Sequence, residues 1–177
     1  MQGPPLLELE LELGREAPAR AELSALAEAG FGTLPRDAQW LIAITLLSEV
    51  CARLGERRYA GQLYALLEPY AGRNVVVGRA ATCNGSASRQ LGMLAAVRGE
   101  WSLAERHLAD ALAMHVAMRA RPLVARTQLA WGEMELARGD LVAGRERLAE
   151  AIVLGDALGM AAMTERARAL VAESVVA

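Results

Sequence analysis

One spacing recurs three times along this chain: a small residue is followed by apolar or small residues 12, 16 and 19 positions later. The copies are Ser48, Ala60, Tyr64 and Leu67; Gly92, Ala104, Leu108 and Ala111; and Gly132, Gly144, Leu148 and Ala151. They start 44 and then 40 residues apart, which is typical of a repeated two-helix unit whose loops have diverged in length. Small side chains where helices cross let the axes approach to about 8–10 Å. The spacing therefore predicts stacked helix pairs, an architecture that offers surfaces to partners and names no reaction.

The composition also favours closely packed helices. Hydrophobic residues make up 54% of the chain and aromatic residues only 4%, so alanine and leucine must fill most of the interior. A chain of 177 residues is long enough for one domain that buries about 70% of its unfolded surface. We predict a single all-α domain of about eight helices, in which antiparallel helix pairs stack as a superhelix.

Glycine and proline positions divide the chain into five segments. These are an N-terminal helical element at residues 1–36, repeats at 37–77, 78–120 and 121–158, and a C-terminal capping helix at 159–177. Within the second repeat, we predict a helix over about residues 78–98, interrupted at Asn84-Gly85-Ser86. Ser102 and Glu105 have the spacing of a capping box, and Asp140 is placed to cap a helix over residues 141–158.

The N-terminal element gives two conflicting signals. Leucine and glutamate alternate over residues 7–13, a period typical of a strand. Both residue types are strong helix formers, however, and helical spacing continues through Leu23 and Leu26. We therefore predict a helix over residues 6–29, and a kink near Gly14 or Pro18 that splits it remains an alternative.

Charge and cysteine usage exclude several classes of function. All 19 basic residues are arginine, so the chain has no lysine for a Schiff base or a phosphate-binding loop. A net charge of −2 argues against direct nucleic-acid binding. Cys51 and Cys83 lie in apolar patterns typical of buried thiols in a reducing compartment. With neither a secretory signal nor an apolar run of about 18 residues, we expect a soluble cytoplasmic protein without membrane contact.

The recurring residues resemble the tetratricopeptide repeat. Leu91-Gly92 and Trp131-Gly132 match its first-helix Leu-Gly pair, and Leu47-Ser48 is a weaker copy. Ala104, Leu108 and Ala111 match the small, large and small positions of its second helix. Two departures are the loss of the first-helix tyrosine, replaced by Cys51, Ala95 and Glu135, and a unit of about 40 residues instead of about 34.

The longer unit is similar to the C-terminal arrays of bacterial signal-transduction ATPases of the LuxR and maltose-activator type. The amino-acid patterns at residues 63–73, 91–95 and 104–108 carry this resemblance. In those regulators an upstream ATPase, and often a DNA-binding module, supplies the activity, and this chain has no phosphate-loop motif. The resemblance implies a protein- or peptide-binding scaffold, either a part of such a regulator or a free-standing relative.

First helices of stacked pairs line a concave groove. By repeat position, the residues expected to face it are Ile42, Thr45, Glu49, Ser86, Arg89, Met93, Arg126, Leu129 and Glu133. Arg89 and Arg126 come from adjacent units, and together they suit a carboxylate or phosphate of a ligand. The alternative is that the two arginines pair with Glu49 and Glu133 as a ladder of ion pairs.

The remaining candidates predict no catalytic, metal or cofactor site. His107 and His115 lie eight residues apart on one helix, out of register for joint ligation of a metal. Asn84-Gly85-Ser86 offers backbone N–H groups to an anion, or else acts as a kink or N-cap. A small-molecule-binding or catalytic protein that uses the groove remains the alternative to a binding scaffold.

The expected partner is a protein or peptide. Five leucines in the eight residues 6–13 also predict that the N-terminal element packs against a second copy of the chain or folds back on its own array.

Overall fold

The computed structural model describes residues 7, 9–11, 13–77 and 82–176, and over these it is all-α apart from one two-stranded hairpin. The long helices are α2 (Glu16–Ala29), α3 (Trp40–Arg53), α4 (Arg57–Leu67), α5 (Ala87–Arg98), α6 (Trp101–Ala117), α7 (Arg121–Arg138), α8 (Leu141–Leu158) and α9 (Ala161–Val176). Two 3₁₀ turns, η1 (Phe31–Thr33) and η2 (Glu68–Tyr70), and strands β1 (Asn74–Val77) and β2 (Thr82–Ser86) lie between the long helices. No described helix is both long and apolar enough to cross a membrane.

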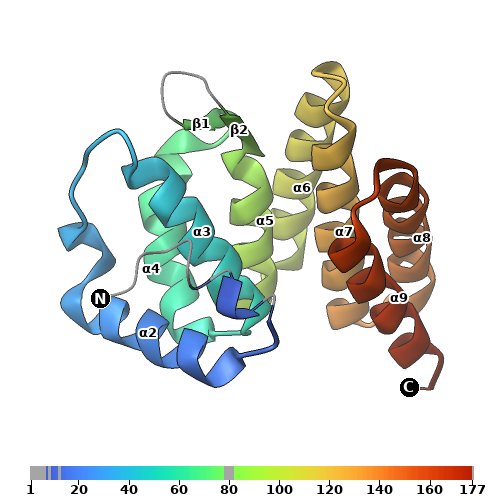
Figure 1. The fold of residues 1–177 in the computed structure, drawn as a ribbon, viewed down its shortest axis with the longest axis horizontal. Helices are drawn as coiled ribbons and strands as arrows, with labels where there is room; N and C mark the ends of the chain where they lie inside the picture. Colours follow the sequence, from blue (N-terminus) through green and yellow to red (C-terminus); the bar gives the residue numbers. More distant parts are fainter. Residues whose placement is uncertain (1–6, 8, 12, 78–81, 177) are drawn as a thin grey trace.

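Consecutive helices pack as pairs along the array (Figure 1). The most extensive contacts join α7 with α8 and α5 with α6, α9 packs mainly on α8, and α3, α4 and α5 contact one another to an equal extent. The glycines that begin the second and third copies of the spacing lie where the two helices of a pair cross. A Cβ atom on Gly92 would lie 2.6 Å from Cγ of Leu108, and one on Gly132 would lie 2.7 Å from Cγ of Leu148. The spacing of small residues in the sequence thus marks points where two helices lie too close together for a larger side chain.

The N-terminal element is helical where it is described, but it does not run straight into α2. Residues 7 and 9–11 are helical, and α2 begins only at Glu16. Gly14 lies between them with φ of +72°, a backbone conformation that ends the first turn at little cost for glycine. Leu7 and Leu11 are buried four residues apart, whereas Leu9 and Leu13 are exposed. The alternation that resembles a strand is therefore the 3.6-residue period of a helix folded back onto the core.

The helix expected over residues 78–98 begins only at Ala87. β1 and β2 form an antiparallel hairpin, and α5 begins at Ala87 with Ser86 as its N-cap. Residues 78–81 lie outside the described part of the chain. Cys83 is exposed on β2, against the expectation that both thiols are buried. Cys51 is fully buried in α3, and burial raises the pKa of its thiol to about 12, so it stays neutral.

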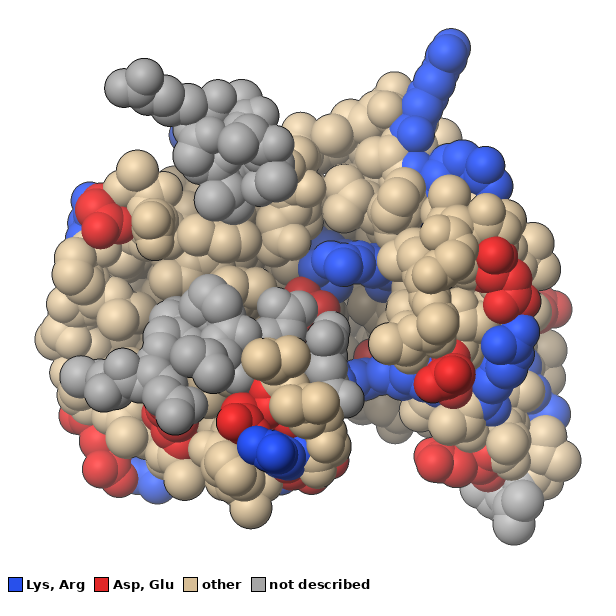
Figure 2. Space-filling model, in the orientation of Figure 1, with Lys and Arg blue, Asp and Glu red and all other residues tan. Residues whose placement is uncertain are grey.

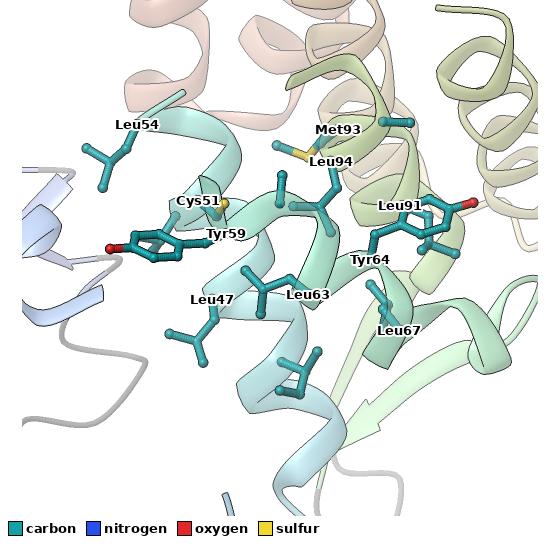
Figure 3. Close-up of a cluster of buried hydrophobic side chains, with 14 of the residues drawn as sticks. Leu47, Cys51, Leu54, Tyr59, Leu63, Tyr64, Leu67, Leu91, Met93 and Leu94 are labelled. Carbon is teal, nitrogen blue, oxygen red and sulfur yellow. The ribbon is translucent and has the colours of Figure 1, made fainter. Parts of the chain in front are cut away.

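A cluster of leucines from α3, α4 and α5 forms the centre of the core (Figure 3). Leu47, Leu63, Leu67, Leu91 and Leu94 have no exposed surface. Their helices supply alternating large and small side chains, which fixes the orientation of α3 relative to α5. This orientation sets the positions of the polar residues on the other face of the same two helices.

One of the two predicted helix caps is present in the structure. Asp140 accepts a hydrogen bond from the backbone N–H of Ala143 at 3.0 Å, as expected for the N-cap of α8. The capping box at Ser102 is wrong, because α6 already begins at Trp101 and its N-cap, Glu100, makes no side-chain hydrogen bond.

Candidate partner-binding groove

Charged side chains from four first helices meet in the hollow between the two halves of the array. Figure 2 shows basic and acidic atoms side by side between the N-terminal half and the half formed by α7, α8 and α9. We call this set the groove cluster; it consists of Glu49 and Arg53 from α3, Arg89 from α5, Arg126 and Glu133 from α7, and Arg166 from α9.

The deepest member of the groove cluster is Arg89. Its side chain is only 2% exposed, and its guanidinium donates to the Glu49 carboxylate at 2.8 Å. The Gln90 amide, with its oxygen toward Arg89, accepts a second hydrogen bond at 2.8 Å and donates to the Ser86 carbonyl at 3.2 Å. Nε of Arg89 is buried and has no hydrogen-bond partner in the described structure. The guanidinium is thus held in place mainly by Glu49.

The two acids of the groove cluster have opposite pKa shifts. Burial disfavours the charge on both. At Glu49, attraction to Arg89, Arg126 and Arg53 outweighs burial and lowers the pKa. At Glu133, burial and repulsion by Glu49 outweigh attraction to Arg166, 2.7 Å away, and raise the pKa.

The groove cluster contains more basic than acidic side chains, four guanidinium groups and two carboxylates. Arg126 is exposed and forms no ion pair with any residue that the structure describes. It is therefore the arginine of the groove cluster that is best placed to meet an anion from solution.

The predicted alternative, a ladder of ion pairs, is correct for Arg89 with Glu49 and wrong for Arg126 with Glu133. Arg89 pairs with Glu49. Glu133, however, pairs with Arg166 of α9 and not with Arg126. Arg89 and Arg126, which were expected to converge, both lower the pKa of Glu49. Arg89 is buried and paired with that carboxylate, so the two arginines meet only through their electrostatic effect on Glu49.

Several expected groove residues are buried instead. Thr45 has no exposed surface and donates to the Ile42 carbonyl within its own helix. Ser86 is buried as the N-cap of α5. Met93 is 8% exposed and packs beside Arg89, with its sulfur 3.8 Å from the guanidinium. Ile42 and Leu129 are half-buried. The accessible polar part of the groove is thus smaller than predicted.

Two arginines of the groove cluster were missed by the sequence reasoning. Arg53 lies one helical turn after Glu49, a spacing that places both on one face of α3. Arg166 lies 40 residues after Arg126, which is the offset between the second and third copies of the repeat. Extending the repeat offset into the last helix would have found Arg166.

His115 of α6 links the end of β2 to α7 through hydrogen bonds. Its ring has no exposed surface, accepts from the Ser86 N–H at Nε2 (2.8 Å) and donates from Nδ1 to the Thr127 hydroxyl (2.9 Å). Thr127 must accept there, because its own proton goes to the Leu123 carbonyl. Burial and the nearby charge of Arg89 lower the pKa of His115 to about 4, so the ring is neutral. Ser86 of the Asn84-Gly85-Ser86 segment is therefore the N-cap of α5, and its own N–H is already bonded.

The described residues contain no group of three or more metal-ligating side chains that could hold a metal ion. His107 accepts or donates a hydrogen bond with the Tyr64 hydroxyl at 2.9 Å, far along α6 from His115. Comparisons with protein-family profiles, with curated proteins and with solved structures found no match to this chain.

Proposed function

We propose that this chain is a protein- or peptide-binding module, built as a tetratricopeptide-like array, that holds an acidic segment of its partner in the groove. The observation that carries the proposal is the exposed Arg126 of the groove cluster, which forms no ion pair with any residue that the structure describes. Resemblance to the arrays of bacterial signal-transduction regulators supports a place in a cytoplasmic regulatory assembly.

The arginines of the groove cluster have separate parts in this proposal. Arg89 is buried beside Glu49 and contributes to the potential of the groove without contacting the partner. Arg126 is exposed and has five N–H donors in a planar fork that matches a carboxylate. Arg166 occupies the same repeat position on the next first helix, so a partner that runs along the groove meets the two in succession.

Selection from a random peptide-display library tests the proposal. We expect peptides selected on the wild-type chain to be enriched in aspartate and glutamate, and their binding to weaken as salt screens the charges. Arg126→Glu reverses a charge in the groove without removing a buried group, and should abolish that enrichment. Arg106→Glu, the same change at an exposed position of α6, is the matched control and should leave it unchanged. Equal acidic enrichment on both variants would refute the proposal.

A further inference from the structure

The two ion pairs of the groove cluster differ in how accessible they are. In the pair of Arg89 with Glu49, the arginine side chain is only 2% exposed. In the second pair, the side chain of Arg166 is 33% exposed and that of Glu133 is 21% exposed. Their hydrogen bond joins Nε of Arg166 to Oε1 of Glu133 at 2.7 Å, a one-point contact that does not use the bidentate geometry of the guanidinium. The second pair is therefore the one that a ligand from solution can exchange.

The charges around Glu133 weaken its hold on Arg166. Burial disfavours the ionised carboxylate, and repulsion by Glu49 of α3 adds to this effect, so the pKa of Glu133 is raised although Arg166 lies beside it. Arg53 of α3 favours the charge and does not reverse the balance. On the other helices that pack on α7, charged residues engage different partners: Arg89 of α5 with Glu49, Glu105 of α6 with Arg138, and Arg147 and Glu150 of α8 with Gln128.

We propose that Glu133 is an internal competitor of the acidic partner: it holds Arg166 in the free chain, and a partner carboxylate displaces it to bind that guanidinium. This inference rests on the proposed function, the binding of an acidic segment in the groove. One acid of the partner meets Arg126 without competition, because Arg126 forms no ion pair with any described residue. A second acid has to replace Glu133. Glu133 thus determines how much affinity the groove gains from a second acid.

The displacement takes up a proton. Once Arg166 binds the partner, Glu133 lies near Glu49 and the incoming carboxylate without its nearest cation, and burial then favours its neutral form. At a pH above the pKa of Glu133 in the free chain, binding therefore transfers one proton from solution to the Glu133 carboxylate. In that range the dissociation constant should fall by up to about tenfold for each unit by which the pH is lowered.

Fluorescence anisotropy with a labelled peptide of about eight aspartates tests the inference, because aspartate stays ionised between about pH 6 and pH 8. We expect the wild-type chain to bind this peptide more tightly as the pH falls across that range. Glu133→Gln keeps the shape of the side chain but cannot compete as an anion, so it should bind about tenfold or more tightly at pH 8 and lose the pH dependence. Glu146→Gln, the same change at an exposed position of α8, is the matched control and should behave as the wild type.

A double-mutant cycle separates displacement from a general change of charge in the groove. Arg166→Met removes the cation for which the two carboxylates compete, so adding Glu133→Gln to this variant should not change its affinity for the peptide. An equal gain from Glu133→Gln with and without Arg166 would overturn the inference, as would a pH dependence that Glu133→Gln leaves intact. Both results would leave the recognition of acidic segments standing. If neither the wild type nor Glu133→Gln binds the aspartate peptide, the proposed function itself fails, and the inference with it.

Discussion

The guanidinium of Arg89 and the carboxylate of Glu49 form a 2.8 Å ion pair across α5 and α3, at the floor of the groove. Arg89 is more deeply buried than Glu49, with 2% against 15% of its side chain exposed. The pair therefore ties two units of the array together, and it takes one of the four arginines of the groove cluster out of reach of a partner. Arg126 on α7 is the exposed arginine of the groove cluster.

Removing one member of this pair is expected to destabilise the fold strongly. Arg89→Met leaves Glu49 without its nearest cation, and loss of one partner of a buried pair typically costs about 3–5 kcal/mol. The double variant Arg89→Met, Glu49→Leu should recover most of that loss, because no buried charge remains unpaired. Urea denaturation measures both. Arg126→Met, which removes an exposed arginine of the same cluster, should change the free energy of unfolding by only about 0.5 kcal/mol.

Neutralising substitutions at the two acids of the groove cluster should have different effects on the stability of the fold. The pKa of Glu49 is lower in the folded chain than its ordinary value, so its charge stabilises the fold above that value, and this stabilisation is lost as the pH falls through the folded pKa. Glu49→Gln should therefore destabilise at pH 7 and match the wild type under acidic conditions.

Glu133 has a raised pKa, so the folded chain favours its neutral form, and ionisation costs stability as the pH rises through the folded pKa. Glu133→Gln should consequently cause no loss of stability at pH 7. Unfolding curves of both variants across the acid range check the contrast, and a loss of stability in Glu133→Gln at pH 7 would contradict it.

His115 predicts a second pH dependence, at higher pH. Its folded pKa of about 4 lies below the ordinary value of 6.5, so the stabilising effect is complete above 6.5 and is lost as the pH falls toward 4. For a ring with no exposed surface the full loss is about 3 kcal/mol. His115→Gln should be less stable at pH 7 but should lose less stability between pH 7 and pH 5. An NMR titration of the His115 ring with a midpoint near 6.5 would show that the ring is not buried in the neutral form.

The helix pairs could be predicted from the sequence because close packing leaves a direct record in residue size. At Gly92 and Gly132 a single Cβ would clash with the facing leucine, so the spacing of small residues reports the helix contact itself. The hairpin β1–β2 could not be found this way. Its strands are short, and Ala87 and Leu91, which follow, continue a helical pattern without a break in periodicity.

The candidate site was only partly predictable because repeat position gives the direction of a side chain but not its partner. Repeat position placed Glu49, Arg89, Arg126 and Glu133 on one face of the array, and in the structure both arginines lower the pKa of Glu49. Which arginine each acid binds depends on the relative placement of α3, α5, α7 and α9, and this is set by core packing. The pairing of Glu133 with Arg166 follows from the position of α9, for which the sequence predicted only a cap.

The glycine at the centre of each helix contact should be sensitive to a single methyl group. Gly92→Ala places a Cβ 2.6 Å from Cγ of Leu108 and 3.1 Å from the Ala104 carbonyl oxygen, and overpacking of this kind costs about 1–3 kcal/mol. Gly61→Ala, on the exposed side of α4 with nothing within 4 Å of the new Cβ, should stabilise by about 1 kcal/mol through helix propensity. Denaturation of the two single variants separates packing from propensity. In the double variant Gly92→Ala, Leu108→Ala the effects should be less than additive, because the added methyl group fills part of the space that the leucine leaves. Strict additivity would show that the two residues do not share the contact on which the helix pairing depends.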